Sequence, residues 1–267
     1  MFEAFDLVIV REKISILHLK EWGFSLKNVV HAPCPYFLFE EDVKYRSRWT
    51  KLISEVKEKN IVVGLTFGGL NMPVGPYDLW PRDQKQFDEF KDLLIFLIKK
   101  KKVKVVFFSH TNGFEKEPEF RLINGRDFRI MEFFYNIMLQ EYPEFEEKIF
   151  LINEPLLPKE IKKVIGMFDF LITGRVHASV VAISQYIPTM FIEYDHAVVQ
   201  SDKMTGFSSL VNMEEFVCDP RNSTQMEERA EYCIDHLTEI GDSLKEKIPI
   251  IKEEAKRAFL TIRNVIS

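Results

Sequence analysis

An arginine and a histidine stand two residues apart directly after an apolar run, in the segment Gly174, Arg175, Val176 and His177. A guanidinium offers a planar fork of N–H donors to a carboxylate or phosphate, and an imidazole titrates near neutral pH. We expect a helix over residues 178–186, whose free N–H groups would face the same anion. A helix-capping turn with an incidental arginine is the alternative. The combination favours anion binding by Gly174 and Arg175 and proton transfer by His177.

Two further groups of candidates follow other apolar runs. Gly68 and Gly69 come shortly after residues 61–65, and glycines there allow the backbone to approach a ligand closely. They match neither a Walker loop nor a dinucleotide-binding fingerprint, so the motif by itself is weak. His110 lies in the polar segment 109–113, which offers hydroxyl, imidazole and amide groups. A plain turn is an equal alternative for that segment.

The last candidates follow the apolar run 189–193. Asp195 and His196 offer groups that could bind a hydroxylated substrate or orient a catalytic residue, and Tyr194 precedes them as a further binding candidate. Adjacent residues can point in different directions, which makes this group secondary. No spacing typical of a metal site occurs here, so we predict no metal.

Apolar, β-branched runs typical of buried strands alternate with amphipathic segments typical of helices. The predicted strands cover residues 7–10, 61–65, 103–108, 149–152, 168–173 and 189–193. The predicted helices include residues 84–101, 127–142 and 158–166. Strands separated by single helices predict an α/β fold with a doubly wound, Rossmann-like parallel sheet from about residue 61 to 193. Ligands bind beyond the carboxyl ends of the strands in such sheets, where the candidate residues fall.

Two flanks lie outside this predicted sheet. The first contains a strand, a helix over 14–21 closed by Gly23, and a proline-bounded extended run over 31–39, which is typical of the end of another Rossmann-like unit. The second flank, residues 226–267, is charged and predicted to form two helices broken at Pro249. We therefore predict three parts, which are a partial N-terminal Rossmann-like segment at 1–45, an α/β domain carrying the site at 46–225, and C-terminal helices at 226–267.

The composition excludes several classes of protein. The 267 residues include 36 Lys+Arg and 41 Asp+Glu. The resulting net charge of −5 does not favour binding to nucleic acid. The lysine run 99–102 is interpreted as a solvated helix end. No apolar run approaches the ~20 residues of a membrane span, and the start lacks a basic leader. Cys34, Cys218 and Cys233 have no ligand spacing, which predicts free thiols in a reducing cytoplasm.

Four stretches of the chain carry a family resemblance. Residues 169–178 end a strand in a Gly-x-Arg-x-His turn, and residues 187–195 contain a proline before a strand and a Tyr-Asp turn after it. Residues 7–15 form a strand-Arg-acid-x-x-Ser segment, and residues 31–37 are similar to an Asp-Pro-Ala-Phe-like strand. Together they resemble the polysaccharide pyruvyl transferase family over nearly the whole chain.

The resemblance implies a GT-B-type architecture of two Rossmann-like domains with the active cleft between them, this chain supplying the second domain and a remnant of the first. Family members transfer a pyruvyl ketal group from phosphoenolpyruvate to sugar hydroxyls of polysaccharides. By position, His177 would be the general acid/base, and Arg175 and Arg11 would bind the anion. The implied partners are a small anionic donor and a glycan acceptor. Phosphoenolpyruvate would be a substrate, with no resident cofactor.

The chain departs from the family pattern at two positions and at its start. Cys34 stands at an acidic position, and Ala197 stands where the family commonly has a lysine. The chain begins inside the expected first domain, which predicts either a fragment or a shortened relative. Two alternatives stay open. One is a GT-B glycosyltransferase or epimerase that uses a nucleotide sugar, and the other is a catalytically inactive domain that binds anions or sugars.

Overall fold

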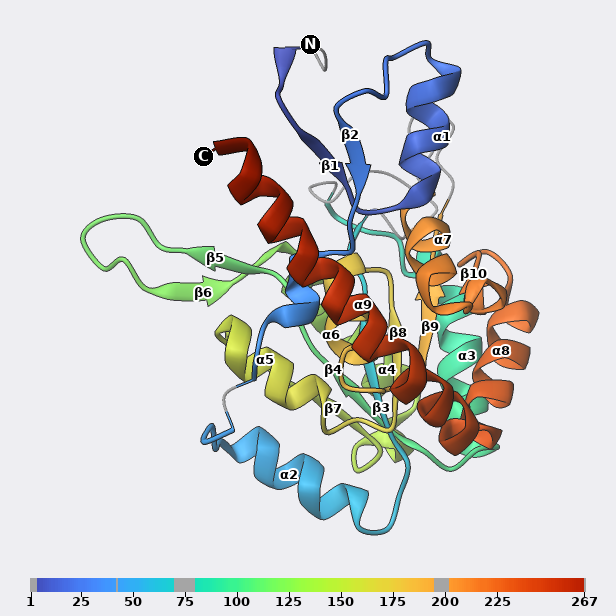
Figure 1. The fold of residues 1–267 in the computed structure, drawn as a ribbon. Coiled ribbons are helices and arrows are strands. Elements are labelled where there is room, and N and C mark those ends of the chain that lie inside the picture. Colours follow the sequence, from blue (N-terminus) through green and yellow to red (C-terminus); the bar gives the residue numbers. More distant parts are fainter. Residues whose placement is uncertain (1–3, 42, 70–79, 195–201, 267) are drawn as a thin grey trace.

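A six-stranded parallel sheet forms the centre of the molecule, in a computed structural model that describes residues 4–41, 43–69, 80–194 and 202–266 (Figure 1). Its strands are β3 (Val62–Thr66), β4 (Lys104–Phe107), β7 (Ile149–Leu151), β8 (Phe170–Thr173), β9 (Thr189–Ile192) and β10 (Val217–Cys218). They lie in the order β10-β9-β8-β3-β4-β7, and every neighbouring pair is parallel. This order defines a doubly wound sheet whose two halves diverge between β3 and β8. The predicted Rossmann-like sheet is confirmed.

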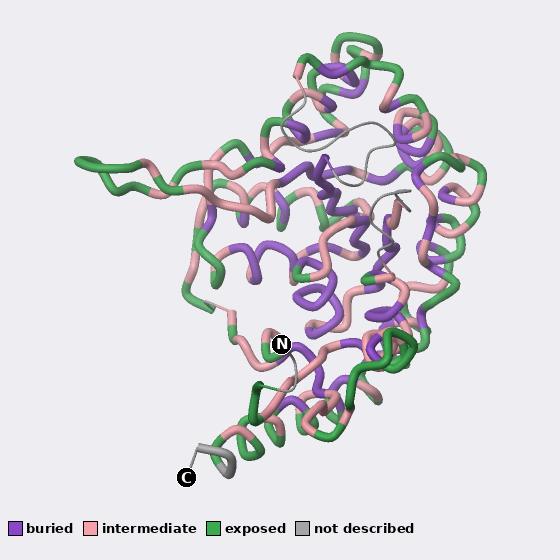
Figure 2. Tube along the Cα trace, turned by 90° about the horizontal axis from the view of Figure 1, so that it is seen from above, coloured by how far each residue is buried: buried purple, intermediate pink, exposed green. Residues whose placement is uncertain are grey.

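Helices cover both faces of this sheet. They are α2 (Arg48–Lys57), α3 (Asp88–Lys99), α4 (Arg126–Glu141), α5 (Pro158–Ile165), α6 (Val176–Ile183), α7 (Lys203–Ser208), α8 (Ser223–Asp235) and α9 (Leu237–Ile266). Along β3, Val63 and Leu65 pack into the core shared with α3 and α4, whereas Val62 packs with α2, α5 and α6. Figure 2 shows the buried residues gathered in the sheet and on the helix faces toward it. Burial on both faces explains the continuous apolar runs.

Phenylalanine rings hold α3 and α4 against the sheet. The Phe67 ring stacks on Phe90 with centroids 4.3 Å apart, and Phe134 packs against Phe87 and Phe107 at 5.1 and 5.6 Å. All five rings are fully buried, and burying one such side chain contributes about 1.5–3 kcal/mol. This cluster fixes the ends of β3 and β4, which lead into the candidate loops.

The N-terminal segment forms a separate βαβ unit of β1 (Val8–Val10), α1 (Lys13–Glu21) and β2 (Val29–His31), with β1 and β2 parallel. The predicted helix closed by a glycine is confirmed, since Gly23 has a φ of +78° after α1. The extended run predicted over 31–39 is wrong beyond β2, because the short 3-10 helix η2 (Pro35–Leu38) follows. A proline at its first position presets φ for a helical turn, and the Phe37 ring is completely buried.

Helix α7 connects this N-terminal unit to the sheet. After β9, the carboxylate of Glu193 accepts hydrogen bonds from the backbone N–H groups of Met204 at 2.8 Å and Thr205 at 3.0 Å, at the start of α7. Helix α1 packs against α7, where Gly206 approaches Ile14 so closely that a Cβ would lie 2.7 Å from Ile14 Cγ2. The placement of the N-terminal unit therefore depends on α7.

The C-terminal helices differ from the prediction. Pro249 lies inside α9 and does not break it, and the break between α8 and α9 falls at His236 instead. A proline removes one helix hydrogen bond, but Ile248, Ile251 and Ala255 are buried and hold this part of α9 by packing. Helix α9 crosses the domain diagonally, packs against η2 and runs toward the N-terminal unit (Figure 1).

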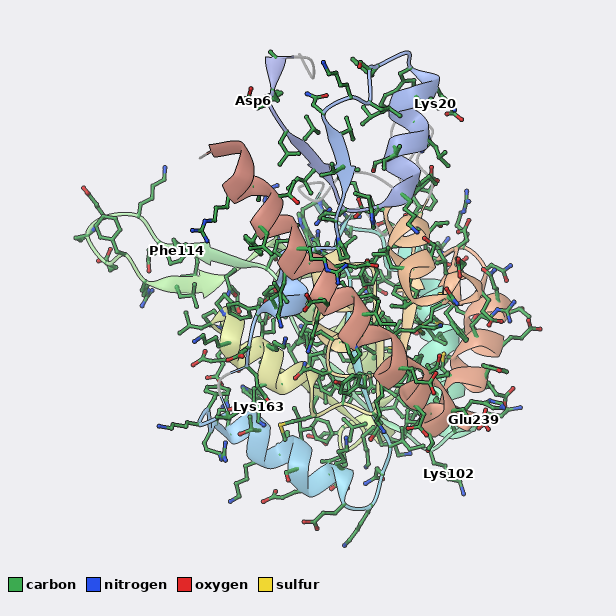
Figure 3. All side chains as sticks on the ribbon, in the orientation of Figure 1. Asp6, Lys20, Lys102, Phe114, Lys163 and Glu239 are labelled. Carbon is green, nitrogen blue, oxygen red and sulfur yellow. The ribbon has the colours of Figure 1, made fainter. Side chains whose placement is uncertain are left out.

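Between β4 and α4 the chain forms an antiparallel hairpin, β5 (Asn112–Phe114) and β6 (Leu122–Asn124), that the sequence analysis did not predict. The hairpin projects from the body of the molecule (Figure 2), and its Phe114 side chain points into solvent (Figure 3). Its strands are too short for a clear alternation of apolar and polar residues. At its base the Gly125 N–H donates to the Thr111 carbonyl at 3.0 Å, which sets the start of α4.

Three expectations concern the whole chain. Cys34, Cys218 and Cys233 are buried free thiols, as predicted. Among the helices that the structure describes, none combines the length and the apolar character that crossing a bilayer requires. Within the same described residues, no three side chains capable of binding a metal ion gather in one place.

Replacing Gly64 by alanine tests the packing of β3. A Cβ at this position would lie 2.3 Å from Phe168 Cδ2 inside the core, so Gly64→Ala is expected to lower the free energy of unfolding by about 1–3 kcal/mol. Gly241→Ala in α9 is the control, because its Cβ would meet only a backbone oxygen at 3.5 Å and alanine favours helices. Urea denaturation compares them; an unchanged midpoint in Gly64→Ala would contradict the prediction.

Candidate functional site

The carboxyl ends of β3 and β8 lie side by side where the two halves of the sheet diverge. Gly68 follows β3, and Gly174 and Arg175 follow β8. Helix α6 begins two residues earlier than expected, so Arg175 is its N-cap residue and His177 lies in its first turn. The backbone N–H of Arg175 donates to Thr173 Oγ1 at 3.0 Å, which shapes the turn between strand and helix.

Arg175 forms an ion pair with Asp127, a residue at the start of α4 that the sequence analysis missed. Arg175 Nε donates to Asp127 Oδ2 at 2.9 Å, and Nη2 donates to Oδ1. The Asp127 side chain is fully buried, and that of Arg175 is 20% exposed. Burial raises the pKa of the Asp127 carboxyl, whereas Arg175 and the Thr111 hydroxyl oppose the rise. An acidic residue in a first helical turn usually indicates only a favourable dipole interaction, so no sequence signal pointed to this pair.

Gly68 provides the space that this ion pair occupies. A Cβ at Gly68 would lie 2.2 Å from Arg175 Nη2 and 2.8 Å from Asp127 Oδ1. Glycine is therefore required here for close approach of a side chain, not for a special backbone conformation. Gly69, next in the chain, is also buried, and the segment after it lies outside the described residues.

Arg11 reaches His177 from the end of β1. Arg11 Nη1 lies 3.2 Å from His177 Nε2, and Arg11 Nη2 lies 3.4 Å from Glu12 Oε1. A guanidinium only donates hydrogen bonds, so His177 Nε2 accepts one and the imidazole is neutral with its proton on Nδ1. The cavity walls that partly desolvate the His177 ring and the Arg11 charge both lower the pKa of His177. The N-terminal unit thus supplies a cation to a histidine of the sheet domain.

His110 lies in the loop after β4 and lines the same cavity as His177. Burial, together with the nearby His177 and Arg175, lowers the pKa of His110 to about 3. Its Nε2 atom is sealed from solvent and has no hydrogen-bond partner among the described residues. The imidazole is neutral at physiological pH, which suits a binding role better than proton transfer.

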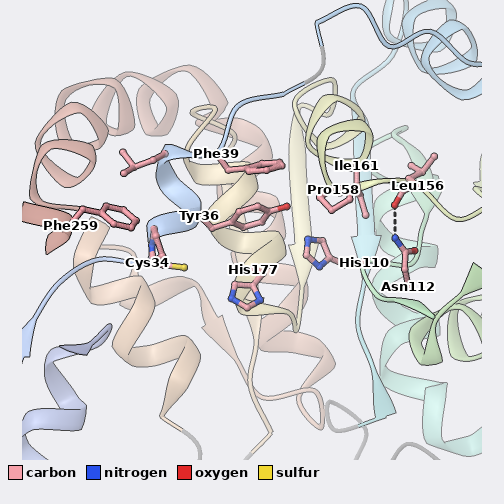
Figure 4. Close-up of a pocket in the computed structure, with 12 residues that line it drawn as sticks. Cys34, Tyr36, Phe39, His110, Asn112, Leu156, Pro158, Ile161, His177 and Phe259 are labelled. Carbon is pink, nitrogen blue, oxygen red and sulfur yellow. Dashed lines mark hydrogen bonds between the residues drawn. The ribbon is translucent and has the colours of Figure 1, made fainter. Parts of the chain in front are cut away.

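An open cavity of about 710 Å³ adjoins both histidines (Figure 4). Its walls come from η2, the loop after β4, the start of α5, and Phe259 of α9. The Tyr36 ring lies edge-on to the His177 ring with centroids 5.9 Å apart, and burial raises the pKa of its hydroxyl. The sequence analysis did not find this cavity, because its walls come from segments that lie far apart in the chain.

A second cavity, of about 870 Å³, is lined by Arg175 and by the start of α4. Arg126, Arg129 and Trp80 line it, and the Arg129 guanidinium lies 4.0 Å from the centre of the Trp80 ring. Asn112 at the base of the hairpin lines both cavities. The two cavities therefore adjoin, one apolar beside His177 and the other rich in arginine beside Arg175.

The last group of predicted site residues lies elsewhere. Arg221 Cζ lies 4.8 Å from the centre of the Tyr194 ring, and Tyr194 is not among the described residues that line either cavity. Asp195, His196 and Ala197 fall outside the described residues. Substrate binding by Tyr194 and Asp195 stays a prediction.

Comparison with solved structures shows that the fold is GT-B-like. The chain is similar to Methanocaldococcus jannaschii UDP-GlcNAc 2-epimerase in complex with UDP-GlcNAc and UDP, with a TM-score of 0.57 and 12% identity over 85% of this chain and 54% of that chain. It is similar to S. aureus MnaA with UDP, with a TM-score of 0.58 and 15% identity over 91% of this chain and 54% of that chain. It is also similar to a trehalose-phosphate synthase from Burkholderia xenovorans in complex with glucose-6-phosphate. That structure has a TM-score of 0.61 and 9% identity over 98% of this chain and 61% of that chain. The chain spans 54 to 61% of the length of these structures.

The family follows from the sequence comparison. Residues 1–196 match the polysaccharide pyruvyl transferase family. Because this match covers most of the chain, the protein belongs to the polysaccharide pyruvyl transferase family, as the resemblance predicted. No curated protein sequence matches the chain. The matched range includes Arg11, Arg175 and His177.

Arg11→Gln tests the contact between the N-terminal unit and His177. The substitution removes the cation 3.2 Å from His177 Nε2, so the pKa of His177, which Arg11 lowers, is expected to rise. Nuclear magnetic resonance titration of the imidazole Cε1–H signals measures this rise directly. Arg48→Gln is the control, because Arg48 instead contacts Asn153 and Trp49 and should leave the His177 curve in place. A His177 curve unchanged by Arg11→Gln would exclude the contact in solution.

His110→Gln tests the burial of a neutral imidazole. The pKa of His110 is about 3 in the folded protein and about 6.5 in an unfolded chain, so the unfolded state takes up the proton first as the pH falls. Wild-type protein is therefore expected to lose about 1–2 kcal/mol of stability from this group between pH 7 and pH 5. Urea denaturation at both pH values should show a smaller loss in His110→Gln. Equal losses in the two proteins would show that His110 is not buried as described.

Proposed function

We propose that this chain carries the site of a pyruvyl transfer from phosphoenolpyruvate to sugar hydroxyls. The contact between Arg11 and His177 carries the proposal, because it joins a cation and a proton acceptor at one point. Phosphoenolpyruvate has a carboxylate and a phosphate, and both need cations or backbone N–H groups. Arg11, the N-terminal end of α6 and the exposed part of Arg175 would bind them. Further substrate-binding residues in the proposal are Gly68, Gly69, Gly174, His110, Tyr194 and Asp195.

The chemistry assigns His177 a proton-transfer role. Two sugar hydroxyl oxygens form bonds to C2 of phosphoenolpyruvate while the bond from C2 to the phosphate oxygen breaks. Of the two hydroxyl protons, one ends on C3 and the other leaves with phosphate. His177 Nε2, neutral and holding a lone pair, takes a proton from an attacking hydroxyl. A bound donor anion would draw Arg11 away from His177 and raise the proton affinity of the ring.

The proposal treats phosphoenolpyruvate as a substrate and needs no resident cofactor or metal. The partners are this small anionic donor and a glycan acceptor. The three buried free thiols suit a reducing compartment such as the cytoplasm, where we place the reaction.

A nucleotide-sugar enzyme is the second candidate, and the arginine-rich cavity supports it. Arg126 and Arg129 there offer charge for a diphosphate, and the Trp80 ring packs against Arg129. The similar structures from M. jannaschii and S. aureus contain UDP. Binding of UDP or of phosphoenolpyruvate separates the two candidates.

Thermal unfolding with each ligand makes that distinction. A ligand at 100 times its Kd adds about 2.7 kcal/mol, which raises the Tm of a chain of this size by roughly 5–10 °C. Phosphoenolpyruvate is expected to give such a rise and UDP is expected to give none. A rise with UDP alone would favour the nucleotide-sugar enzyme, and no rise with either would rule out the proposed donor site.

His177→Asn then tests the chemistry apart from the binding. Removing a general acid/base lowers the rate about 10²–10⁴-fold, while the rise in Tm with phosphoenolpyruvate is expected to persist. Phosphate release from phosphoenolpyruvate in the presence of a glycan mixture measures the rate. His236→Asn, at the junction of α8 and α9, is the matched control. Full activity in His177→Asn would end the proposed role of this histidine.

A further inference from the structure

The cavity beside His177 has walls unlike those of an anion site. The described lining residues include Tyr36, Phe39, Leu156, Ile161 and Phe259 but neither Arg11 nor Arg175. Among the described lining residues, His110 and His177 are the only basic side chains, and both are neutral for the reasons given above. An anion in this cavity would lose hydration without gaining a cation. The cavity therefore suits a neutral ligand.

Aromatic rings dominate the part of the cavity nearest to His177. In Figure 4 the Tyr36 ring lies between Phe39 and His177, with ring centroids 5.0 Å from Phe39 and 5.9 Å from His177. Phe259 of α9 lies beside η2 in the lining (Figure 4) and is 52% exposed. Flat aromatic faces of this kind pack well against the C–H groups on one face of a sugar ring.

Polar groups stand among these rings and match a hydroxylated ligand. The Tyr36 hydroxyl, the His110 imidazole and the Asn112 amide all belong to the lining, and the Asn112 amide is held in place by donating to the Leu156 carbonyl at 2.5 Å. A few fixed polar groups in a mostly apolar cavity are typical of a small-molecule site that sets ligand orientation. A purely aliphatic ligand would displace water from the Tyr36 hydroxyl without replacing the lost hydrogen bond.

We propose that this cavity is the acceptor subsite, which holds a neutral sugar ring against Tyr36 and Phe259 with one hydroxyl at His177 Nε2. The inference rests on the proposed function, because it takes His177 as the group that receives the hydroxyl proton. In this arrangement the charged donor and the neutral acceptor bind on different sides of His177. The anionic donor binds on the side of Arg11 and Arg175, and the neutral acceptor binds on the side of η2 and α9. Helix α9 thereby becomes part of the substrate site.

Saturation-transfer NMR with simple glycosides tests the acceptor subsite. The probes are the methyl glycosides of glucose, galactose, mannose and N-acetylglucosamine, with methyl glucuronide as the anionic counterpart. We expect at least one neutral glycoside to bind through its ring protons and the glucuronide to bind more weakly. Phe259→Ala should raise the Kd of the bound glycoside about 3- to 10-fold, the range expected for loss of one stacking contact. Leu260→Ala is the matched control, since Leu260 is 58% exposed and next in α9 but not in the lining.

The outcomes separate this inference from the proposed function. If phosphoenolpyruvate raises the Tm and none of the four neutral glycosides binds, the acceptor subsite is wrong and the donor site stands. Octyl glucoside is added as a probe with an alkyl chain. If it binds through its alkyl protons alone, the cavity takes an aliphatic group and the inference fails. Equal effects of Phe259→Ala and Leu260→Ala would also overturn it. Glycoside binding that Phe259→Ala weakens, without any effect of phosphoenolpyruvate, would support the sugar site and refute the donor.

Discussion

The ion pair between Arg175 and the buried carboxylate of Asp127 is the interaction on which the site depends. Taking two charges out of water costs several kcal/mol, and pairing offsets that cost only when the geometry is good. Here two guanidinium nitrogens meet two carboxylate oxygens, in a space that Gly68 keeps open. The pair joins the start of α4 to the start of α6. It thereby fixes the turn from which His177 faces the cavity.

The same pair changes how charge is distributed in the site. Arg175 is the more obvious anion-binding residue from its position after a strand, but Asp127 balances its charge locally. Arg11, which approaches from the N-terminal unit, lies 3.2 Å from His177 Nε2 and, after burial of the ring, contributes to the lowered pKa of that histidine. The contact between Arg11 and His177 is therefore shared between the N-terminal unit and the sheet domain. In the proposed function, donor binding and proton transfer would be coupled, because both involve Arg11.

Long periodic segments and the ends of buried strands could be predicted from the sequence, because a short apolar run such as 103–108 is typical of a strand that helices cover on both faces. The positions of Gly68 and Arg175 at one edge of the sheet could also be predicted, because both follow strands of a parallel sheet, whose carboxyl ends lie at the same edge. β10 and the β5–β6 hairpin are too short to leave a pattern, and Pro249 does not break α9, since packing outweighs one lost hydrogen bond. Asp127 and Phe259 join the site through tertiary contacts, which no local spacing reveals.

Glycine at position 206 has a consequence that reaches well beyond α7. Ile14 and Glu12 press directly on it, and Glu12 is the immediate neighbour of Arg11 in the chain. A side chain at this position would clash with Ile14 and Glu12, so α1 and α7 would have to move apart, and we expect Arg11 to move away from His177 with them. The electrostatic surroundings of His177 therefore depend on the small size of a residue in α7, a helix none of whose described residues lines the cavity.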